Sequence, residues 1–177
     1  MVKNKTMNKG LVLSEAKGFT LIELIVVIAI MAIMTGIGLA YFNKFNEEKK
    51  ISGEVSRLVD VLHLARSKSM AGDLSPMPAC TDFSGYQVEI IQTAYSFVFC
   101  CGDCTGGNKI PLQSHTLYST VLADNTYSLL FKPSTGVVNT GLTSEKTITF
   151  TDTSISKSAT VTVQNSGLIS YTNLTAL

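Results

Sequence analysis

Tryptophan is absent from this chain of 177 residues, and charged residues make up only 15% of it. The formal net charge is +1, so nothing in the overall balance indicates a nucleic-acid-binding protein. Proline occurs four times and first at Pro76. No proline therefore interrupts a long helix in the N-terminal part of the chain.

Groups suited to catalysis are scarce as well. Histidine occurs twice: His63 has no second ligand at metal-binding spacing, and His115 stands beside Ser114, where adjacent strand residues face apart. No glycine-rich phosphate loop precedes a helix, and the dipeptide Gly106-Gly107 indicates a turn. The sequence therefore predicts no enzyme, no catalytic residue, no metal and no cofactor. Three scattered aspartates are typical of turns: Asp103, Asp124 and Asp152.

What the chain does have is a long uncharged run, from Leu24 to Phe42, which spans 19 residues. At a rise of about 1.5 Å per residue it reaches about 28 Å, close to the thickness of a bilayer core. This length is unusual for a buried helix of a soluble protein or for a secretory signal peptide, although Gly38-Leu39-Ala40 resembles a signal cleavage site. We therefore expect a membrane-spanning helix.

One acidic residue, Glu23, stands at the start of this apolar segment. A carboxylate in hydrocarbon costs about 2.5–3.5 kcal/mol, so we expect it to have a partner. No cation lies within one helical turn, and Lys17, six positions back, points elsewhere. If the chain were cut after Gly18, the new α-amine on Phe19 would lie one turn before Glu23. That amine could neutralise the carboxylate of its own chain or of a neighbour.

The segment Lys17-Gly18-Phe19-Thr20-Leu21-Ile22-Glu23-Leu24, with the apolar run after it, resembles the type III signal of type IV pilins and pseudopilins. The resemblance implies that a prepilin peptidase cleaves between Gly18 and Phe19 and methylates the amine of Phe19. Glu23 then matches the acidic residue that pairs with the N-terminal amine of an adjacent subunit during filament assembly. One departure is that many pilins carry a proline near the end of the apolar run, whereas this chain has Thr35-Gly36-Ile37-Gly38.

The function that this resemblance implies is that of a structural subunit, a pilin or minor pseudopilin of a type IV pilus or type II secretion-type filament. Its partners would be prepilin peptidase, other pilin or pseudopilin subunits, and the membrane. We expect a single pass through the inner membrane with an extracytoplasmic C-terminal domain. The alternative is an unassembled, single-span, membrane-tethered binding domain.

The predicted fold class is α+β, a long N-terminal helix packed on an antiparallel sheet. We expect a basic, cleaved leader at 1–18, a transmembrane and assembly helix at 19–42, its soluble continuation at 43–72 and a β domain at 73–177. The apolar positions of the continuation recur every three or four residues and predict a buried stripe. That stripe comprises Phe45, Ile51, Val55, Leu58, Val59, Leu62, Ala65 and Met70.

After residue 85, segments rich in β-branched and aromatic residues alternate with turn signals and predict an antiparallel meander. A hairpin turn is expected at Asn165-Ser166-Gly167. The expected strands are Gln87–Ile91, Tyr95–Cys100, Thr116–Leu122, Ser128–Lys132, Thr147–Thr151, Thr160–Gln164 and Leu168–Tyr171.

Three short segments resemble the H-type pseudopilins of type II secretion and FimT-type minor pilins. These segments are Leu64–Ser67, Leu130–Gly136 and the stretch from Thr160 to Ile169. From residue 72 onward, four lysines face seven acidic residues, a net charge of −3. This acidic balance argues against direct binding of nucleic acid.

Four cysteines, Cys80, Cys100, Cys101 and Cys104, all follow the apolar run, and an even number outside the cytoplasm predicts two disulfides. Because Cys100 and Cys101 are adjacent on a strand, they should choose different partners. We favour Cys80–Cys100 with Cys101–Cys104, and the exchanged pairing is the alternative. A redox-active or zinc-binding role is disfavoured, because the single C-x-x-C lacks a following helix and Cys80 stands alone.

Overall fold

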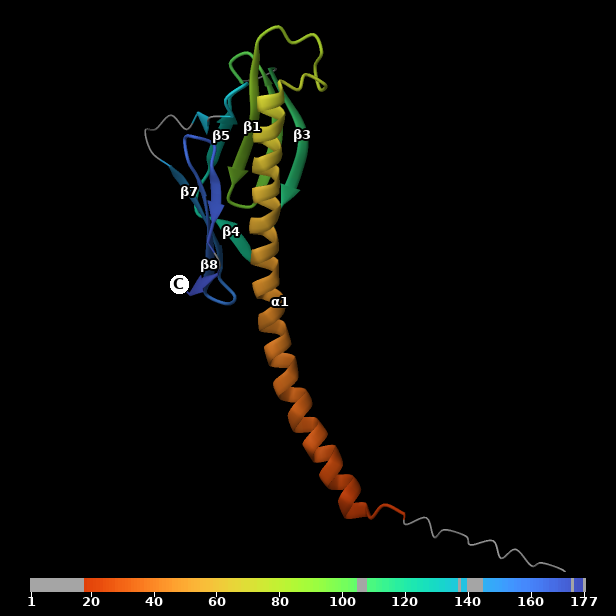
Figure 1. Cartoon of the computed structure of the whole chain (residues 1–177). Coiled ribbons are helices and arrows are strands. Elements are labelled where there is room, and N and C mark those ends of the chain that lie inside the picture. Colours follow the sequence, from red (N-terminus) through yellow and green to blue (C-terminus); the bar gives the residue numbers. More distant parts are fainter. Residues whose placement is uncertain (1–17, 105–107, 137, 140–144, 173, 177) are drawn as a thin grey trace, which may run out of the picture. The chain divides into compact units, whose positions relative to one another are not determined.

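A computed structural model describes residues 18–104, 108–136, 138–139, 145–172 and 174–176; for 37–40 and 138–139 it describes the backbone alone. The leader, apart from Gly18, and the expected turn at Gly106-Gly107 lie outside these residues. One helix, α1 (Leu21–Ala71), precedes all strands. The chain divides into two compact units, 1–41 and 42–177, which are described in turn. The predicted α+β class is confirmed (Figure 1).

In the second unit, α1 buries the predicted stripe with two exceptions. Ile51, Leu58 and Leu62 are fully buried, and the neighbouring Val55, Val59 and Ala65 complete the buried face. Phe45 and Met70, at the two ends of the stripe, are exposed, so the prediction is wrong there. Gly72 ends the helix with a positive φ of 63°, a conformation that glycine adopts without steric cost.

The strands form two antiparallel sheets, with orders β3-β2-β1-β5-β6 and β10-β8-β7-β4; β9 also pairs with β8. The first sheet contains β1 (Phe83–Ile91), β2 (Ala94–Cys101), β3 (Lys109–Thr116), β5 (Tyr127–Phe131) and β6 (Val138–Asn139). The second contains β4 (Val121–Ala123), β7 (Lys146–Asp152), β8 (Lys157–Val163), β9 (Ile169–Tyr171) and β10 (Thr175–Ala176). Side chains from α1 and from both sheets share one buried core.

A single meander was therefore the wrong expectation, although the antiparallel pairing is confirmed. The chain leaves the first sheet after β3, places β4 at an edge of the second, and returns so that β5 pairs with β1. The expected turn between β8 and β9 is confirmed, because the Gly167 amide donates to the Gln164 carbonyl and the Gln164 amide donates to the Leu168 carbonyl.

The strand expected at Thr116–Leu122 does not exist as one element. β3 ends at Thr116, and a turn in which the Val121 amide donates to the Tyr118 carbonyl separates it from β4. The sequence gives little sign of β3 because this edge strand contains Pro111 and a run of exposed polar side chains. Its pairing with β2 is irregular between Phe97 and Val98, where Leu112 is left without a partner.

Two glycines come close to other backbone segments. Gly85 has a φ of 127°, and a Cβ built on it would lie 1.9 Å from the Phe131 carbonyl oxygen. A Cβ built on Gly167 would lie 2.2 Å from the Gly136 carbonyl oxygen and 2.9 Å from Arg66 Nε. The segments around Arg66, Gly136 and Gly167, which sequence similarity had singled out separately, therefore meet at one place in the fold.

Candidate functional site

The predicted processing segment lies immediately before α1. Residues 18–20 are not helical, and the side chain of Phe19 is 80% exposed. Thr20 caps the helix, because its Oγ1 accepts a hydrogen bond from the Glu23 amide at 3.3 Å while its carbonyl accepts one from the Leu24 amide at 3.2 Å. The bond between Gly18 and Phe19 therefore lies in exposed, non-helical backbone.

Thr20 is a structural residue that the prediction passed over. Thr20 and Glu23 have the Thr-x-x-Glu spacing of a capping box, which marks a helix start in sequence alone. Glu23 itself is in the first turn of α1, where the helix dipole favours a carboxylate. Within the residues that the structure describes, Glu23 makes no ion pair, and its side chain is exposed.

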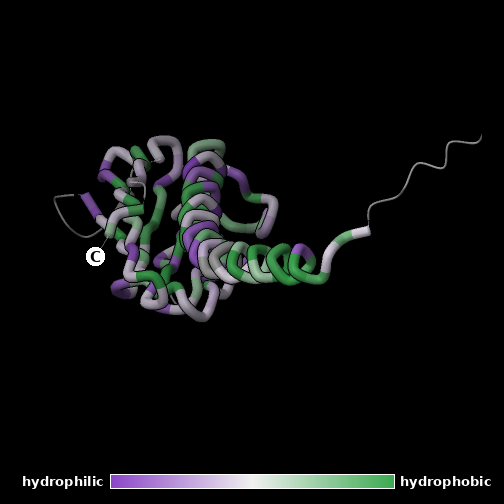
Figure 2. The backbone as a smooth tube through the Cα atoms, turned by 90° about the horizontal axis from the view of Figure 1, so that it is seen from below, coloured by the Kyte–Doolittle hydropathy of each residue, from purple (hydrophilic) through white to green (hydrophobic). Residues whose placement is uncertain are grey.

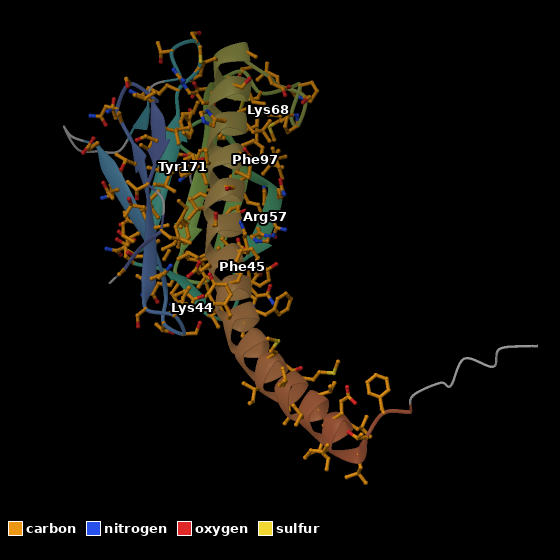
Figure 3. All side chains as sticks on the ribbon, turned by 60° about the horizontal axis from the view of Figure 1, so that its bottom comes forward. Lys44, Phe45, Arg57, Lys68, Phe97 and Tyr171 are labelled. Carbon is orange, nitrogen blue, oxygen red and sulfur yellow. A yellow bond between two sulfur atoms is a disulfide. The ribbon has the colours of Figure 1, made fainter. Side chains whose placement is uncertain are left out.

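From Leu21 to Gly36 every side chain of α1 is exposed, and nearly all of them are apolar. In Figure 2 the backbone of this part of the helix is coloured as hydrophobic along most of its length, and Figure 3 shows its side chains projecting away from the ribbon. The segment is long and apolar enough to span a membrane, by length and composition. A surface this apolar requires cover by lipid or by protein. Together these features support membrane anchoring.

The segment that replaces the pilin proline, Thr35-Gly36-Ile37-Gly38, begins with a side-chain hydrogen bond inside the helix. Thr35 Oγ1 donates to the Met31 carbonyl at 2.7 Å, so the hydroxyl is satisfied within the helix. This bond allows a polar side chain to occupy an apolar environment at little cost. A Cβ on Gly36 would meet no atom within 4 Å, so no contact among the described residues requires glycine there.

The cysteines form two disulfides, Cys80–Cys101 and Cys100–Cys104. The favoured pairing, Cys80 with Cys100, was wrong, and the exchanged pairing is the one observed. Side-chain alternation along β2 explains the outcome. Cys101 lies on the same face as Phe97 and Phe99 and packs against the main core that includes Cys80. Cys100 lies on the opposite face, in a small cluster with Cys104.

A contact between a buried carboxylate and a histidine inside the second unit was also missed. Glu54 on α1 is 1% exposed, and its Oε2 lies 2.9 Å from Nε2 of His115 on β3. Arg57 Nη1 is 3.7 Å from the other carboxylate oxygen, and the ring of Tyr95 packs on His115 with centroids 5.1 Å apart. Glu54 falls between Ile51 and Leu58 on the buried stripe. An acidic residue at such a position was the signal in the sequence that a buried carboxylate would need a partner.

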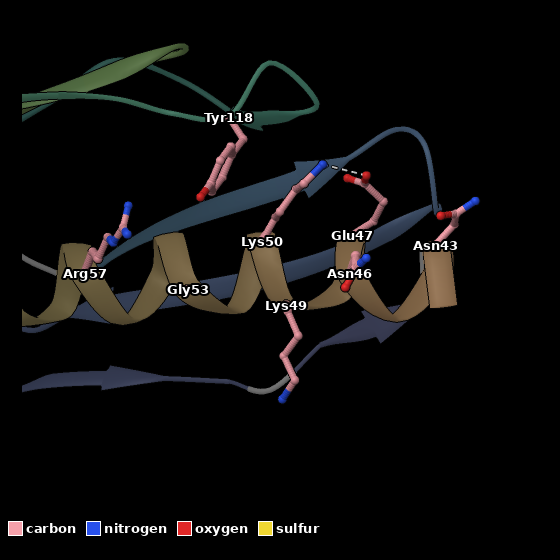
Figure 4. A pocket seen from close by; sticks show the side chains of 8 residues that line it. All are labelled: Asn43, Asn46, Glu47, Lys49, Lys50, Gly53, Arg57 and Tyr118. Atoms are coloured by element: carbon pink, nitrogen blue, oxygen red, sulfur yellow. Dashed lines mark hydrogen bonds and ion pairs between the residues drawn. The ribbon is translucent and has the colours of Figure 1, made fainter. Parts of the chain in front are cut away.

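An open groove of about 480 Å³ lies where α1 passes Tyr118 (Figure 4). Most of its lining residues are polar or charged, and one of them, Lys50, is bound to Glu47 at 2.6 Å. Tyr118 is the one aromatic side chain among these lining residues, whereas small-ligand pockets are typically lined by several hydrophobic and aromatic side chains. Among the residues described, no three histidine, cysteine or acidic side chains are grouped so as to hold a metal ion.

Comparison with protein families identifies the Prokaryotic N-terminal methylation motif at residues 13–39. The match includes Gly18, Phe19 and Glu23 and much of the apolar helix. Neither the curated proteins nor the solved structures gave a significant match. The motif implies that the chain is a type IV pilin-like substrate of prepilin peptidase, and it supports assembly with other pilins.

Proposed function

We propose that this protein is a non-enzymatic structural subunit of a type IV pilus or type II secretion-type filament. The observation that carries the proposal is the methylation motif, followed at once by a helix whose apolar side chains are exposed on all sides. A filament core made of such helices would cover this surface with protein as lipid is left behind. The short segments around Arg66, Gly136 and Gly167 further favour a minor pseudopilin of the H type or a FimT-type pilin.

In the proposed mechanism, prepilin peptidase cleaves after Gly18 and methylates the amine of Phe19. The capped start of α1 then places that amine one turn before Glu23. Each charge is costly in hydrocarbon, and the cost falls when the amine of one subunit meets the carboxylate of another. Pairing therefore favours the assembled state and sets the depth at which adjacent helices align.

The mass of the N-terminal peptide, measured on protein recovered from its native membrane, tests processing. We expect a peptide that starts at N-methylated Phe19. An intact leader would instead indicate the alternative function, an unassembled domain tethered to the membrane by one span. A start at Tyr41 would mean that the segment is a secretory signal and that the proposal is wrong.

The role of Glu23 is tested by Glu23→Ala. The variant should insert and be cleaved as the wild type is, because neither step uses the carboxylate, but its yield of sheared filaments should fall at least tenfold. The matched control is Glu145→Ala, which removes an exposed carboxylate from the second unit and should leave the yield unchanged. Wild-type yield from Glu23→Ala would refute the assigned role.

A further inference from the structure

The two disulfides are crossed along the sequence. Cys100 lies between Cys80 and Cys101, and its own partner, Cys104, lies beyond both. The native bond from Cys80 closes a separation of 21 residues, and the incorrect bond to Cys100 would be shorter by one. Because closure entropy changes very slowly with loop length, the unfolded chain has almost no preference between these two bonds.

The folded sheet distinguishes them sharply. Cys101 shares a face of β2 with Phe97 and Phe99, which are almost completely buried in the main core. Bringing Cys100 to Cys80 would require β2 to shift by one residue or to turn over. Either change would move both phenylalanines to the opposite face. A chain that has formed Cys80–Cys100 therefore cannot pack its native core.

The order of synthesis favours the incorrect bond. Cys80 is made first, and Cys100 is the next cysteine to follow it. Once that bond has formed, Cys101 and Cys104 remain, at the spacing of a C-x-x-C motif that also closes easily. Oxidation without subsequent exchange therefore leads readily to Cys80–Cys100 with Cys101–Cys104, the pairing that the folded sheet excludes.

From this we infer that the protein requires a thiol–disulfide isomerase, an enzyme with a reactive thiolate, as a partner in its maturation. An oxidant that carries a disulfide accepts two electrons and two protons for each bond formed in the chain. The isomerase then rearranges the bonds without net oxidation or reduction. This inference concerns folding in an oxidising compartment, which is part of the proposed function, but its chemistry does not depend on filament assembly.

Each step of the rearrangement forms one S–S bond and breaks another. The isomerase thiolate attacks Cys104 Sγ in the incorrect Cys101–Cys104 bond, and Cys101 leaves as a thiolate. Cys101 then attacks Cys80 Sγ and displaces Cys100 as a thiolate. Cys100 finally attacks Cys104 Sγ and releases the isomerase thiolate unchanged. The adjacency of Cys100 and Cys101 makes the middle step an exchange between neighbours.

Refolding of the full chain tests the inference. The reduced protein is unfolded in urea with detergent, diluted, and oxidised with diamide, either alone or followed by a reduced and oxidised glutathione mixture as the exchange probe. Fragmentation mass spectrometry then assigns the bonds. We expect about half or less of the native pairing without glutathione, because closure entropies are nearly equal, and at least twice as much with it. Equal and complete native pairing in both samples would overturn the inference.

Two matched double variants separate mispairing from other causes of slow folding. Cys100→Ser with Cys104→Ser leaves only Cys80–Cys101 available, and should become trypsin-resistant with or without glutathione. Cys101→Ser with Cys104→Ser leaves only Cys80–Cys100, and should stay trypsin-sensitive in both conditions. The inference fails if the second variant folds as well as the first, or if the first also needs glutathione.

Discussion

At the scale of single residues, the buried carboxylate of Glu54 in the second unit needs a partner. Burial of a charge is costly unless the charge is paired, and His115 supplies the close partner at 2.9 Å. The pair joins the helix to β3, an edge strand whose backbone pairs with β2. Its value is therefore structural: it fixes the strand on the helix.

His115→Ala should lower the free energy of unfolding by about 2–3 kcal/mol, because it leaves the buried Glu54 carboxylate without its close partner. Denaturant unfolding of the detergent-solubilised chain measures this loss. Ser114→Ala, an exposed neighbour, should change stability by less than about 0.5 kcal/mol. In a Glu54→Leu background, His115→Ala should cost much less. An equal cost in both backgrounds would show that the pair is not the cause.

Three buried tyrosines make stability depend on alkaline pH. Burial raises the pKa of Tyr86, Tyr95 and Tyr127 from the usual 10.0 to about 12. The folded state therefore favours the neutral form of these three phenols. Their contribution is fully present below pH 10, and it is lost as the pH rises from 10 to 12.

Absorbance at the phenolate band should reveal these three groups as a late step that coincides with loss of the fold. Tyr86→Phe removes one of them, together with the hydrogen bond that its hydroxyl donates to the Asp73 carbonyl at 2.8 Å. The variant should be less stable at neutral pH but should lose less stability between pH 10 and pH 12. Ionisation of all six tyrosines near pH 10 in folded protein would contradict the burial argument.

At the scale of elements, two glycines give opposite expectations for the same substitution. Gly85→Ala should destabilise the protein by about 3 kcal/mol or more, because the backbone conformation is strained for alanine and the new Cβ meets the Phe131 carbonyl. Gly53→Ala, on an exposed helix position with nothing within 4 Å, should stabilise it by about 0.5–1 kcal/mol. Thermal unfolding of the two variants measures both effects, and the same sign for both would contradict this account.

The helix and most strands were predictable because their signals are local. An uncharged run, a repeat of three and four, and Asn-Ser-Gly between apolar strands each depend on a few adjacent residues. The sheet order was not predictable, because the pairing of β5 with β1 depends on contacts that are remote in sequence. β3 was missed because Pro111 and the polar residues after it resemble a loop when the partner strand is unknown.

In the candidate site, too, the residues in a local motif were predictable, and those that depend on distant contacts were not. Gly18, Phe19 and Glu23 stand in a contiguous motif, so the sequence alone was sufficient to select them. The disulfide pairing could be narrowed to two arrangements but not decided, because the choice between Cys100 and Cys101 depends on which face of β2 meets the core. Glu54 and His115 were unpredictable as a pair, since 61 positions separate them.

At the scale of the whole molecule, the two units differ in whether their apolar side chains are exposed to solvent. The first exposes an apolar helix, whereas the second encloses an apolar core built from Ile51 to Ile169. A chain shortened to begin at Phe42 should therefore dissolve without detergent as a monomer and unfold cooperatively. Sedimentation and denaturant unfolding measure these properties. Aggregation of the shortened chain would show that the apolar helix is required for the second unit to fold.

Pro111 limits aggregation between copies of the chain that are concentrated in a membrane. Neighbouring copies that present open sheet edges could join strand to strand and form irreversible aggregates. In β3 the proline removes a backbone donor, and the irregular pairing at Leu112 distorts the same edge. The long open edge of the first sheet is thus a poor template for a copy, which leaves the proposed assembly to the apolar helix.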